Sequence, residues 1–370
     1  MENRTAVQSL RERRMKDKER FTSNRKLDHI RICLEEPVER GWPGFDEIRL
    51  SHCALPECNL DELITGTTFL AHDFEIPLFI AGMTGGHPET REINRRLARA
   101  AERFGIGLGV GSQRAAIVDP ALEDTFSVVR EEAPHAFIVA NLGIVQLRDH
   151  GMEWAERAVE MIDADAIAIH LNFLQEAIQP EGDHDATGCT DALTSLCSEF
   201  GLPVIVKETG SGISAETART CWTAGASAID VGGWGGTSWA AIEGLRACER
   251  ENSGLARLGE VFEEWGIPTV VSICEAASTG GPIIATGGIR SGLHMAKAMT
   301  LGADLSGMAL PLLAPALEGE EALFKKIEEI SHEFKVAMFL SGSRNTAELC
   351  SKKAYFTGKI REMLEHDGGI

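Results

Sequence analysis

The sequence lacks a long hydrophobic run, a CxxC cysteine pair, an internal repeat and a low-complexity segment. No apolar stretch approaches the roughly 18 residues that a membrane-spanning helix needs, so we expect no membrane partner. The nine cysteines are odd in number and scattered along the chain, and no signal peptide is recognisable. Together these absences predict reduced thiols in a cytoplasmic protein.

Basic residues are outnumbered by acidic ones. The 370 residues include 36 Lys and Arg against 56 Asp and Glu, which gives a net charge of -20. A chain this acidic is not expected to bind nucleic acid or an anionic membrane unless a basic patch is segregated locally. The hydrophobic share of 44% is ordinary for a globular protein, and the length fits one large domain or two ordinary ones.

The beginning of the chain differs from the rest. It runs through RERRMKDKER, is highly charged and has no periodic apolar face. We therefore predict a solvated, charged N-terminal arm over residues 1–24, followed by one folded domain over residues 25–370.

Eight short apolar segments follow, each ended by glycine or polar residues and separated from the next by a helical pattern. They span residues 76–83, 106–112, 136–143, 166–172, 203–210, 228–236, 282–289 and 305–313. Continuous apolarity marks strands that are buried on both faces, as in a parallel sheet. The pattern predicts an α/β fold, a (β/α)8 TIM barrel. A doubly wound sheet is the alternative, but nothing in the spacing requires its switch point.

The segment GIPTVVSICEAAST, residues 266–279, is a candidate ninth strand. Its apolar residues recur at helical spacing, and Pro268 suits the first position of a helix. We therefore predict a helix here, inside an insertion between the sixth and seventh strands.

Glycine and polar residues gather at the carboxyl ends of these strands, where barrels carry their active sites. After the seventh strand, ATGGIRSG opens a helix, and its backbone N–H groups suit an anion. The cluster DVGGWGGTS follows the sixth strand, so two glycine-rich exits predict one phosphate held from both sides, such as the phosphate of FMN. A tight turn with Arg290 on the surface is the alternative.

Two further strand ends carry residues that are costly to bury. Lys207 ends the strand PVIVK, where it suits the N1–O2 edge of a flavin, a Schiff base, or a structural pair with Glu208. The segment HLNFLQEAIQPEGD, residues 170–183, releases several polar side chains within one short stretch. It suits a binding site at the mouth of a barrel, or else a solvated helix start with Asn172 as the N-cap.

Together the motifs NRKLDHI, AGMTGG, GVGSQR, HLNFLQEAIQPEGD, VKETGSGIS, DVGGWGGTS and GGIRSG resemble the type 2 isopentenyl-diphosphate delta-isomerase family in order and spacing. The resemblance runs from Arg25 to the end of the chain and includes AMFLSGSRNTAEL. It implies isomerisation of isopentenyl diphosphate to dimethylallyl diphosphate in isoprenoid biosynthesis. It further implies FMN that acts in its reduced state, Mg²⁺, NAD(P)H as the reductant, and a homo-oligomer that is a tetramer or an octamer.

The resemblance also implies roles for individual residues. The catalytic residues would be Gln175, His170 and Asn172, and the Mg²⁺ ligand would be Glu176. The diphosphate substrate would be bound by Arg25, Lys26, His29, Ser112, Gln113, Arg114 and Gln175. FMN would be bound by Gly82, Met83, Thr84, Ser112, Asn141, Lys207, Thr237, Gly287, Gly288, Ile289, Arg290, Ala309 and Leu310.

Two positions depart from the family pattern. Gly232 stands where the family usually has serine, so we expect one hydroxyl fewer near the flavin phosphate. His294 stands where an acidic residue is expected, and we assign it no role. Two alternatives to the isomerase remain, an FMN-dependent oxidoreductase of a hydroxy acid or nucleotide and a non-enzymatic flavin-binding sensor.

Overall fold

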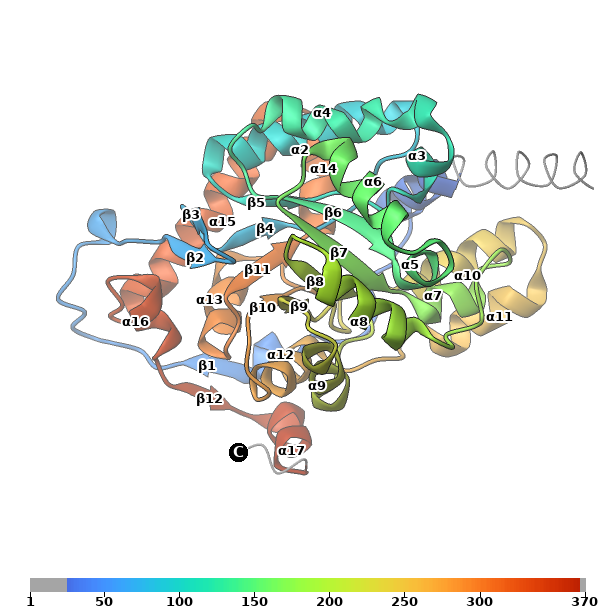
Figure 1. Ribbon diagram of the computed structural model, residues 1–370. Coiled ribbons are helices and arrows are strands. Elements are labelled where there is room, and N and C mark those ends of the chain that lie inside the picture. The colour runs from blue at the N-terminus through green and yellow to red at the C-terminus, as the bar shows by residue number, and fades with distance from the viewer. Residues whose placement is uncertain (1–24, 367–370) are drawn as a thin grey trace, which may run out of the picture.

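Eight parallel strands close into a barrel in the computed structural model, which describes residues 25–366 (Figure 1). Each predicted apolar segment contributes one strand, so the predicted (β/α)8 barrel is confirmed. In order around the barrel, the strands are β10 (Ile283–Ala285), β11 (Leu305–Met308), β4 (Leu78–Ile80), β5 (Gly107–Gly109), β6 (Ile138–Gly143), β7 (Ala166–Leu171), β8 (Val204–Glu208) and β9 (Ala228–Asp230).

Helices follow the barrel strands and cover the outside of the barrel (Figure 1). They are α2 (Arg91–Phe104), α3 (Arg114–Val118), α4 (Asp124–Glu132), α5 (Ile144–His150), α6 (Met152–Ile162), α7 (Phe173–Ile178), α8 (Cys189–Glu199), α9 (Ala215–Thr223), α10 (Trp239–Glu249), α11 (Ser253–Phe262), α12 (Thr269–Ala277), α13 (Gly292–Thr300), α14 (Leu310–Glu318) and α15 (Glu320–Leu340). The short helix α16 (Thr346–Cys350) and helix α17 (Gly358–His366) come last.

The candidate ninth strand is helical, as predicted. It forms α12, which begins at Thr269, one residue later than predicted, so that Pro268 is the N-cap and not the first helical residue. The insertion between β9 and β10 also contains α10 and α11. These two helices approach closely at Gly244 and Gly259, where a Cβ on either residue would overlap the backbone of the other helix.

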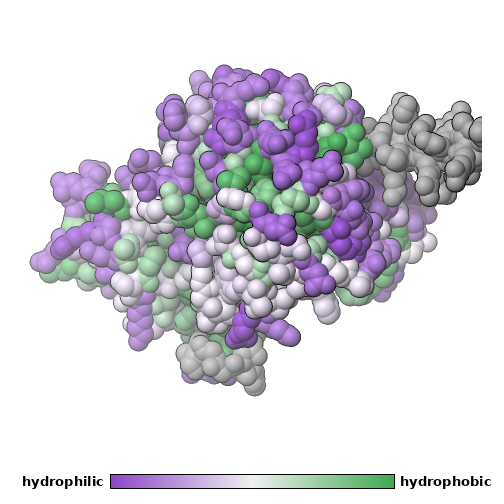
Figure 2. Space-filling view, in the orientation of Figure 1, coloured by the Kyte–Doolittle hydropathy of each residue, from purple (hydrophilic) through white to green (hydrophobic). Residues whose placement is uncertain are grey.

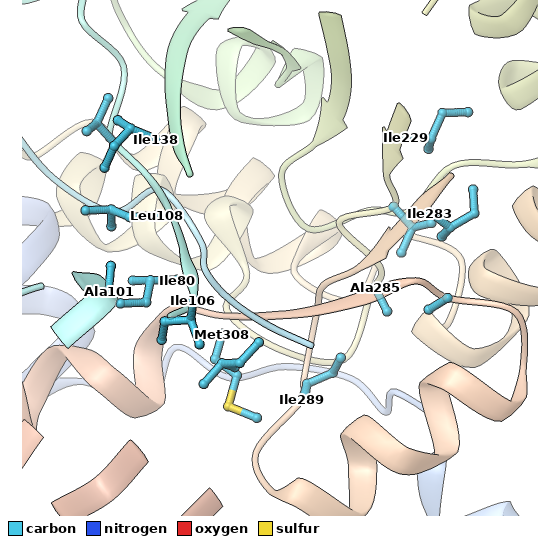
Figure 3. Packing of buried hydrophobic residues seen from close by; sticks show 14 of the residues in the cluster. Ile80, Ala101, Ile106, Leu108, Ile138, Ile229, Ile283, Ala285, Ile289 and Met308 are labelled. Carbon is cyan, nitrogen blue, oxygen red and sulfur yellow. The ribbon is translucent and has the colours of Figure 1, made fainter. Parts of the chain in front are cut away.

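The barrel strands separate two apolar layers, because successive side chains of a strand point to opposite faces. Inside the barrel, Phe79, Ala168 and Ile205 belong to one buried cluster. On the outer side, Ile80, Leu108, Ile138 and Met308 pack in a larger cluster with residues of the surrounding helices such as Ala101 (Figure 3). Burial on both faces is the reason that these strands read as continuous apolar runs.

An antiparallel hairpin, β2 (Thr67–Phe69) with β3 (His72–Phe74), closes the end of the barrel at which the strands begin. Phe69 and Phe74 pack with Phe137, which precedes β6, and with Leu305, the first residue of β11. The opposite end, at which the strands finish, is left for the site.

The two ends of the described chain pack on the barrel. The helical segment 25–35 places Ile32 against Ile242 of α10, and both side chains are fully buried. Near the other end, β1 (Ile48–Leu50) pairs antiparallel with β12 (Ala354–Phe356). The predicted charged arm, residues 1–24, lies outside the described residues.

Ion pairs are frequent on the outer helices. Hydrophilic side chains cover the face over α2 and α4 in Figure 2, and arginines of α2 pair with acidic residues of α2 and α4 there. The Nε atom of Arg99, for example, lies 2.7 Å from a carboxylate oxygen of Glu132. Among residues 25–366, no helix has the length and apolarity that a bilayer crossing demands.

Candidate active site

A cavity of about 220 Å³ opens at the carboxyl ends of the barrel strands. Residues at or just after the end of every barrel strand line it, as do residues of the helical segment 25–35. The lining includes nearly all the predicted site residues, namely Arg25, Lys26, His29, Gly82, Met83, Thr84, Ser112, Arg114, Asn141, His170, Asn172, Gln175, Glu176, Lys207, Thr237, Gly287, Gly288, Arg290, Ala309 and Leu310.

Two predicted residues do not line this cavity. The side chain of Gln113 is fully buried, donates to the carbonyl of Ala158 at 2.7 Å and accepts from the backbone N–H of Asn141 at 2.8 Å. The side chain of Ile289 is also fully buried and belongs to the outer core cluster (Figure 3). The Gln113 side chain therefore supports neighbouring backbone, the Ile289 side chain packs in the outer core, and neither lines the cavity.

Cationic side chains gather at the mouth of the cavity. Arg25 donates from Nη1 to Oε1 of Gln179 at 2.9 Å and lies 3.5 Å from Glu181, while Arg114 lies 3.6 Å from Asp183. Burial, followed by the nearby charge of Arg25, lowers the pKa of Lys26 to about 7. An anion bound here would restore the full charge of Lys26.

Glu176 is buried among donors on helix α7 and the loop after it. Its carboxylate accepts from Nδ2 of Asn172 at 2.9 Å, from Nε2 of Gln179 at 3.2 Å and from the backbone N–H of Asp183 at 2.9 Å. Asn172 occupies the N-cap position of α7, but its side chain makes no capping hydrogen bond and turns to Gln175 and Glu176 instead. The alternative is therefore correct in placing Asn172 at the N-cap, but its buried side chain does not cap a solvated helix start.

His170 ends strand β7 and is buried as a neutral imidazole. Burial lowers its pKa to about 3, and the charges of Lys207 and Lys26 add to this effect. Its Nδ1 lies 2.8 Å from Oδ1 of Asn141, whose Nδ2 donates to the carbonyl of Val110 at 2.9 Å. Because that second bond fixes the orientation of the Asn141 amide, Nδ1 of His170 must donate, which leaves Nε2 as the acceptor.

Lys207 pairs across the sheet with a residue that the sequence patterns did not single out. Its Nζ lies 3.3 Å from Oδ2 of Asp230, which stands opposite it in the β8–β9 register, and it donates to the carbonyl of Glu208 at 3.0 Å. The carboxylate of Glu208 is engaged elsewhere, since it accepts backbone N–H groups from residues 210–212. The expected alternative, a structural ion pair between Lys207 and Glu208, is therefore not formed.

The two glycine-rich exits meet backbone to backbone. Gly287 and Gly288 have positive φ angles, 104° and 66°, and a Cβ on Gly287 would overlap the carbonyl of Gly233. Gly232 also has a positive φ, 48°, and a Cβ there would overlap the carbonyl of Glu208. The local backbone therefore leaves no room for a side chain at Gly232, where the resemblance led us to expect serine.

Three further polar residues, Arg290, Thr84 and His294, differ in their surroundings. Arg290 donates from Nε to Glu39 at 2.7 Å and still lines the cavity. The hydroxyl of Thr84 is buried and finds no hydrogen-bond partner within residues 25–366. His294, to which we assigned no role from the sequence, stacks on Phe45 with ring centroids 4.8 Å apart. This packing contact belongs to the helix that follows the β10 exit.

A buried charge network behind the cavity was missed. Glu243 of α10 accepts from Nε2 of His29 at 3.0 Å and from Nε2 of Gln175 at 2.9 Å, and it pairs with the fully buried Arg246. Burial alone would raise the pKa of Glu243, but His29 and Arg246 outweigh it and lower the pKa to about 2. A glutamate and an arginine three residues apart in the apolar sequence WAAIEGLRACE were the available signal.

Comparisons with known proteins agree with this geometry. The family model described as FMN-dependent dehydrogenase matches residues 151–355. A structure of a mandelate oxidase with a monooxide FMN adduct superposes with a TM-score of 0.59 at 17% identity, covering 85% of this chain and 90% of that one. At this identity the superposition speaks for the fold alone.

Two curated relatives are far more similar. Isopentenyl-diphosphate delta-isomerase of Methanoregula boonei is 62% identical over 351 residues, which cover 94% of this chain and 98% of the relative. Isopentenyl-diphosphate delta-isomerase of Methanosarcina mazei is 53% identical over 349 residues, which cover 94% and 95%. The chain is thus an enzyme and belongs to the type 2 isopentenyl-diphosphate delta-isomerase family.

Proposed function

We propose that this enzyme converts isopentenyl diphosphate to dimethylallyl diphosphate, using FMN in its reduced state and Mg²⁺. One observation carries the proposal: a single cavity holds cationic residues, a buried carboxylate, a lysine at a strand end and two glycine-rich exits. A diphosphate needs the cationic residues and the carboxylate. A flavin needs the glycine-rich exits for its phosphate and the lysine for its ring. A relative that is 62% identical bears the name of this activity.

The donor set fits FMN. The backbone of the two glycine exits would hold the phosphate, and the buried hydroxyl of Thr84 is a polar group that awaits a partner. Lys207 would face the ring, where a cation opposes the negative charge of the reduced form. When bound, reduced FMN would supply electrostatic stabilisation and acid–base chemistry beside the reacting carbons.

The residues fit Mg²⁺ only when the substrate completes its coordination. No group of three or more His, Cys, Asp or Glu residues in the described part of the chain is arranged to hold a metal ion. Glu176 offers one buried carboxylate beside the cationic mouth, and Mg²⁺ typically binds through one or two carboxylates together with substrate phosphates. Glu176 would therefore hold the ion against the diphosphate and neutralise part of its charge.

The chain's own residues would position the hydrocarbon part of the substrate. The reaction adds a proton at C4 and removes one from C2, and positive charge develops at C3. Gln175 is held from both sides, because its Nε2 donates to Glu243 and its Oε1 accepts from Asn172 at 3.2 Å. His170 contributes a neutral acceptor, so it adds no positive charge beside the developing cation.

One experiment separates this isomerase from its alternatives. The enzyme is incubated without oxygen with isopentenyl diphosphate, Mg²⁺, FMN and an amount of NAD(P)H or dithionite far below that of substrate, in deuterated water. We expect many turnovers for each reductant, and deuterium in the recovered diphosphates. Product limited to the reductant supplied would refute the isomerase and favour the oxidoreductase, whereas FMN binding without any product would favour the sensor.

The oxidoreductase alternative has one observation in its favour, the match to the FMN-dependent dehydrogenase model. Four expectations remain predictions. They are a cytoplasmic location, assembly into a tetramer or octamer, NAD(P)H as the reductant, and a boundary at residue 25 between the charged arm and the domain. Gel filtration and light scattering of the purified enzyme would test the assembly.

A further inference from the structure

Asp230 is a fully buried carboxylate directly behind the cavity, and its only cationic neighbour among the described residues is Lys207. The two residues stand opposite each other in the parallel register of β8 and β9, and Oδ2 of Asp230 lies 3.3 Å from Nζ of Lys207. Lys207 lines the main cavity, whereas Asp230 lines only a small space inside the barrel beneath it. Asp230 therefore acts on the cavity through Lys207.

The carboxylate is held in place by residues that follow β9 and β10. Its Oδ1 accepts from the hydroxyl of Thr286 and from the backbone N–H of Gly232 at 3.3 Å. The Thr286 hydroxyl in turn accepts from the same N–H at 3.0 Å. These bonds occupy Oδ1 and leave Oδ2 directed at the lysine, so the distance between the two charges is fixed by the ends of β8, β9 and β10.

We propose that Asp230 is a positioning residue that sets how much of the Lys207 charge a bound flavin experiences. This inference rests on the proposed binding of FMN. Reduction adds negative charge to the flavin, and the ammonium of Lys207 stabilises that charge. A carboxylate at a fixed 3.3 Å offsets part of this stabilisation in a site with little water to screen it. Asp230 thereby lowers the preference of the site for reduced over oxidised FMN.

The substitution Asp230→Asn tests this without removing a side chain. Asparagine keeps an oxygen that accepts from Thr286 and Gly232, and it loses the charge. We expect the ratio of the FMN dissociation constants, oxidised over reduced, to rise at least tenfold, equivalent to about 30 mV in the midpoint potential of the bound two-electron couple. Both constants are measured by titration of apoenzyme, and the potential by anaerobic dye equilibration.

Two controls make the result specific. Asp304 is a second aspartate of the barrel and is partly buried. It accepts from the backbone N–H of Ile283 at 2.8 Å, at the end where the strands begin. Asp304→Asn is expected to leave the ratio unchanged. In a Lys207→Met background, Asp230→Asn is also expected to leave the ratio unchanged, because a buried carboxylate that has lost its cationic partner takes up a proton and carries no charge to remove.

The outcomes separate this inference from the proposed function. If wild-type enzyme binds FMN and Asp230→Asn weakens both redox states equally, Asp230 is only structural and the inference is overturned. The inference is also overturned if the ratio changes by the same factor when Lys207 is absent. If the wild-type enzyme binds no FMN in either state, the proposed function fails together with the inference.

Discussion

Substitution of Glu243 by glutamine should destabilise the enzyme and impair catalysis together. The carboxylate is fully buried, accepts from His29 and Gln175 with one oxygen, and pairs with Arg246 through the other. Glutamine keeps a single oxygen. Either Arg246 or the pair His29 and Gln175 therefore loses its acceptor and meets an amide donor instead.

The expected loss is about 3–5 kcal/mol in the free energy of unfolding, because breaking a buried ion pair leaves the partner charge uncompensated. Among residues 25–366, the acidic contacts that Arg246 would keep are longer, 3.5 Å to Glu181 and 3.7 Å to Asp28. With an unfolding entropy of roughly 2 cal/mol/K per residue, a chain of 370 residues should lose about 4–7 °C in melting temperature. Turnover should also fall, because Gln175 loses the charge that orients it.

A matched control lies on the next helix. Glu260 and Arg257 of α11 are also three residues apart, but their side chains are 66% and 72% exposed. Glu260→Gln should change the unfolding free energy by less than about 0.5 kcal/mol. Urea unfolding followed by tryptophan fluorescence, thermal scans at one rate and isomerase turnover would be measured for both variants. Equal stability of the two variants would refute the argument from burial.

The pH dependence gives an independent check on Glu243. Its pKa in the folded enzyme is lowered to about 2 from an ordinary value of 4.5. A carboxyl with a depressed folded pKa contributes stability that is complete above its unfolded pKa and is lost as the pH falls through the folded one. The difference in unfolding free energy between wild type and Glu243→Gln should therefore be constant above pH 4.5 and shrink between pH 4.5 and 2. A difference that grows on acidification would contradict this sign.

Three further substitutions test the cavity. Lys207→Ala should weaken FMN binding or destabilise the anionic reduced state of FMN. FMN titration and activity with excess FMN measure these effects, and normal values for both would show that the lysine has only a structural role. Glu176→Gln should still bind FMN but lose Mg²⁺-dependent activity, by roughly the 1.5–3 kcal/mol of a charge-assisted contact, and an unchanged Mg²⁺ titration would rule out the metal assignment. Because the pKa of Lys26 is lowered to about 7, diphosphate affinity of the wild type should fall as the pH rises from 7 to 9, more steeply than in Lys26→Arg. Calorimetry at several pH values measures both proteins, and parallel profiles would exclude Lys26 as the titrating group.

The sequence alone determined the barrel and most of the cavity lining. Strands buried on both faces must be apolar throughout, and all eight were visible as continuous runs. Because parallel strands in a barrel end at one rim, residues at strand ends such as Asn141, His170 and Lys207 had to converge once the barrel was accepted.

Only the tertiary structure decided which side chains face each other. Asp230 meets Lys207 because of the β8–β9 register, and Glu243 reaches His29 across 214 positions of sequence. In the same way, Gln113 stands beside cavity residues in sequence, yet its side chain turns into the wall to hold Asn141. Sequence patterns record the burial and turn preferences of each residue locally. Partners such as these depend on register and packing between distant segments, which no local pattern encodes.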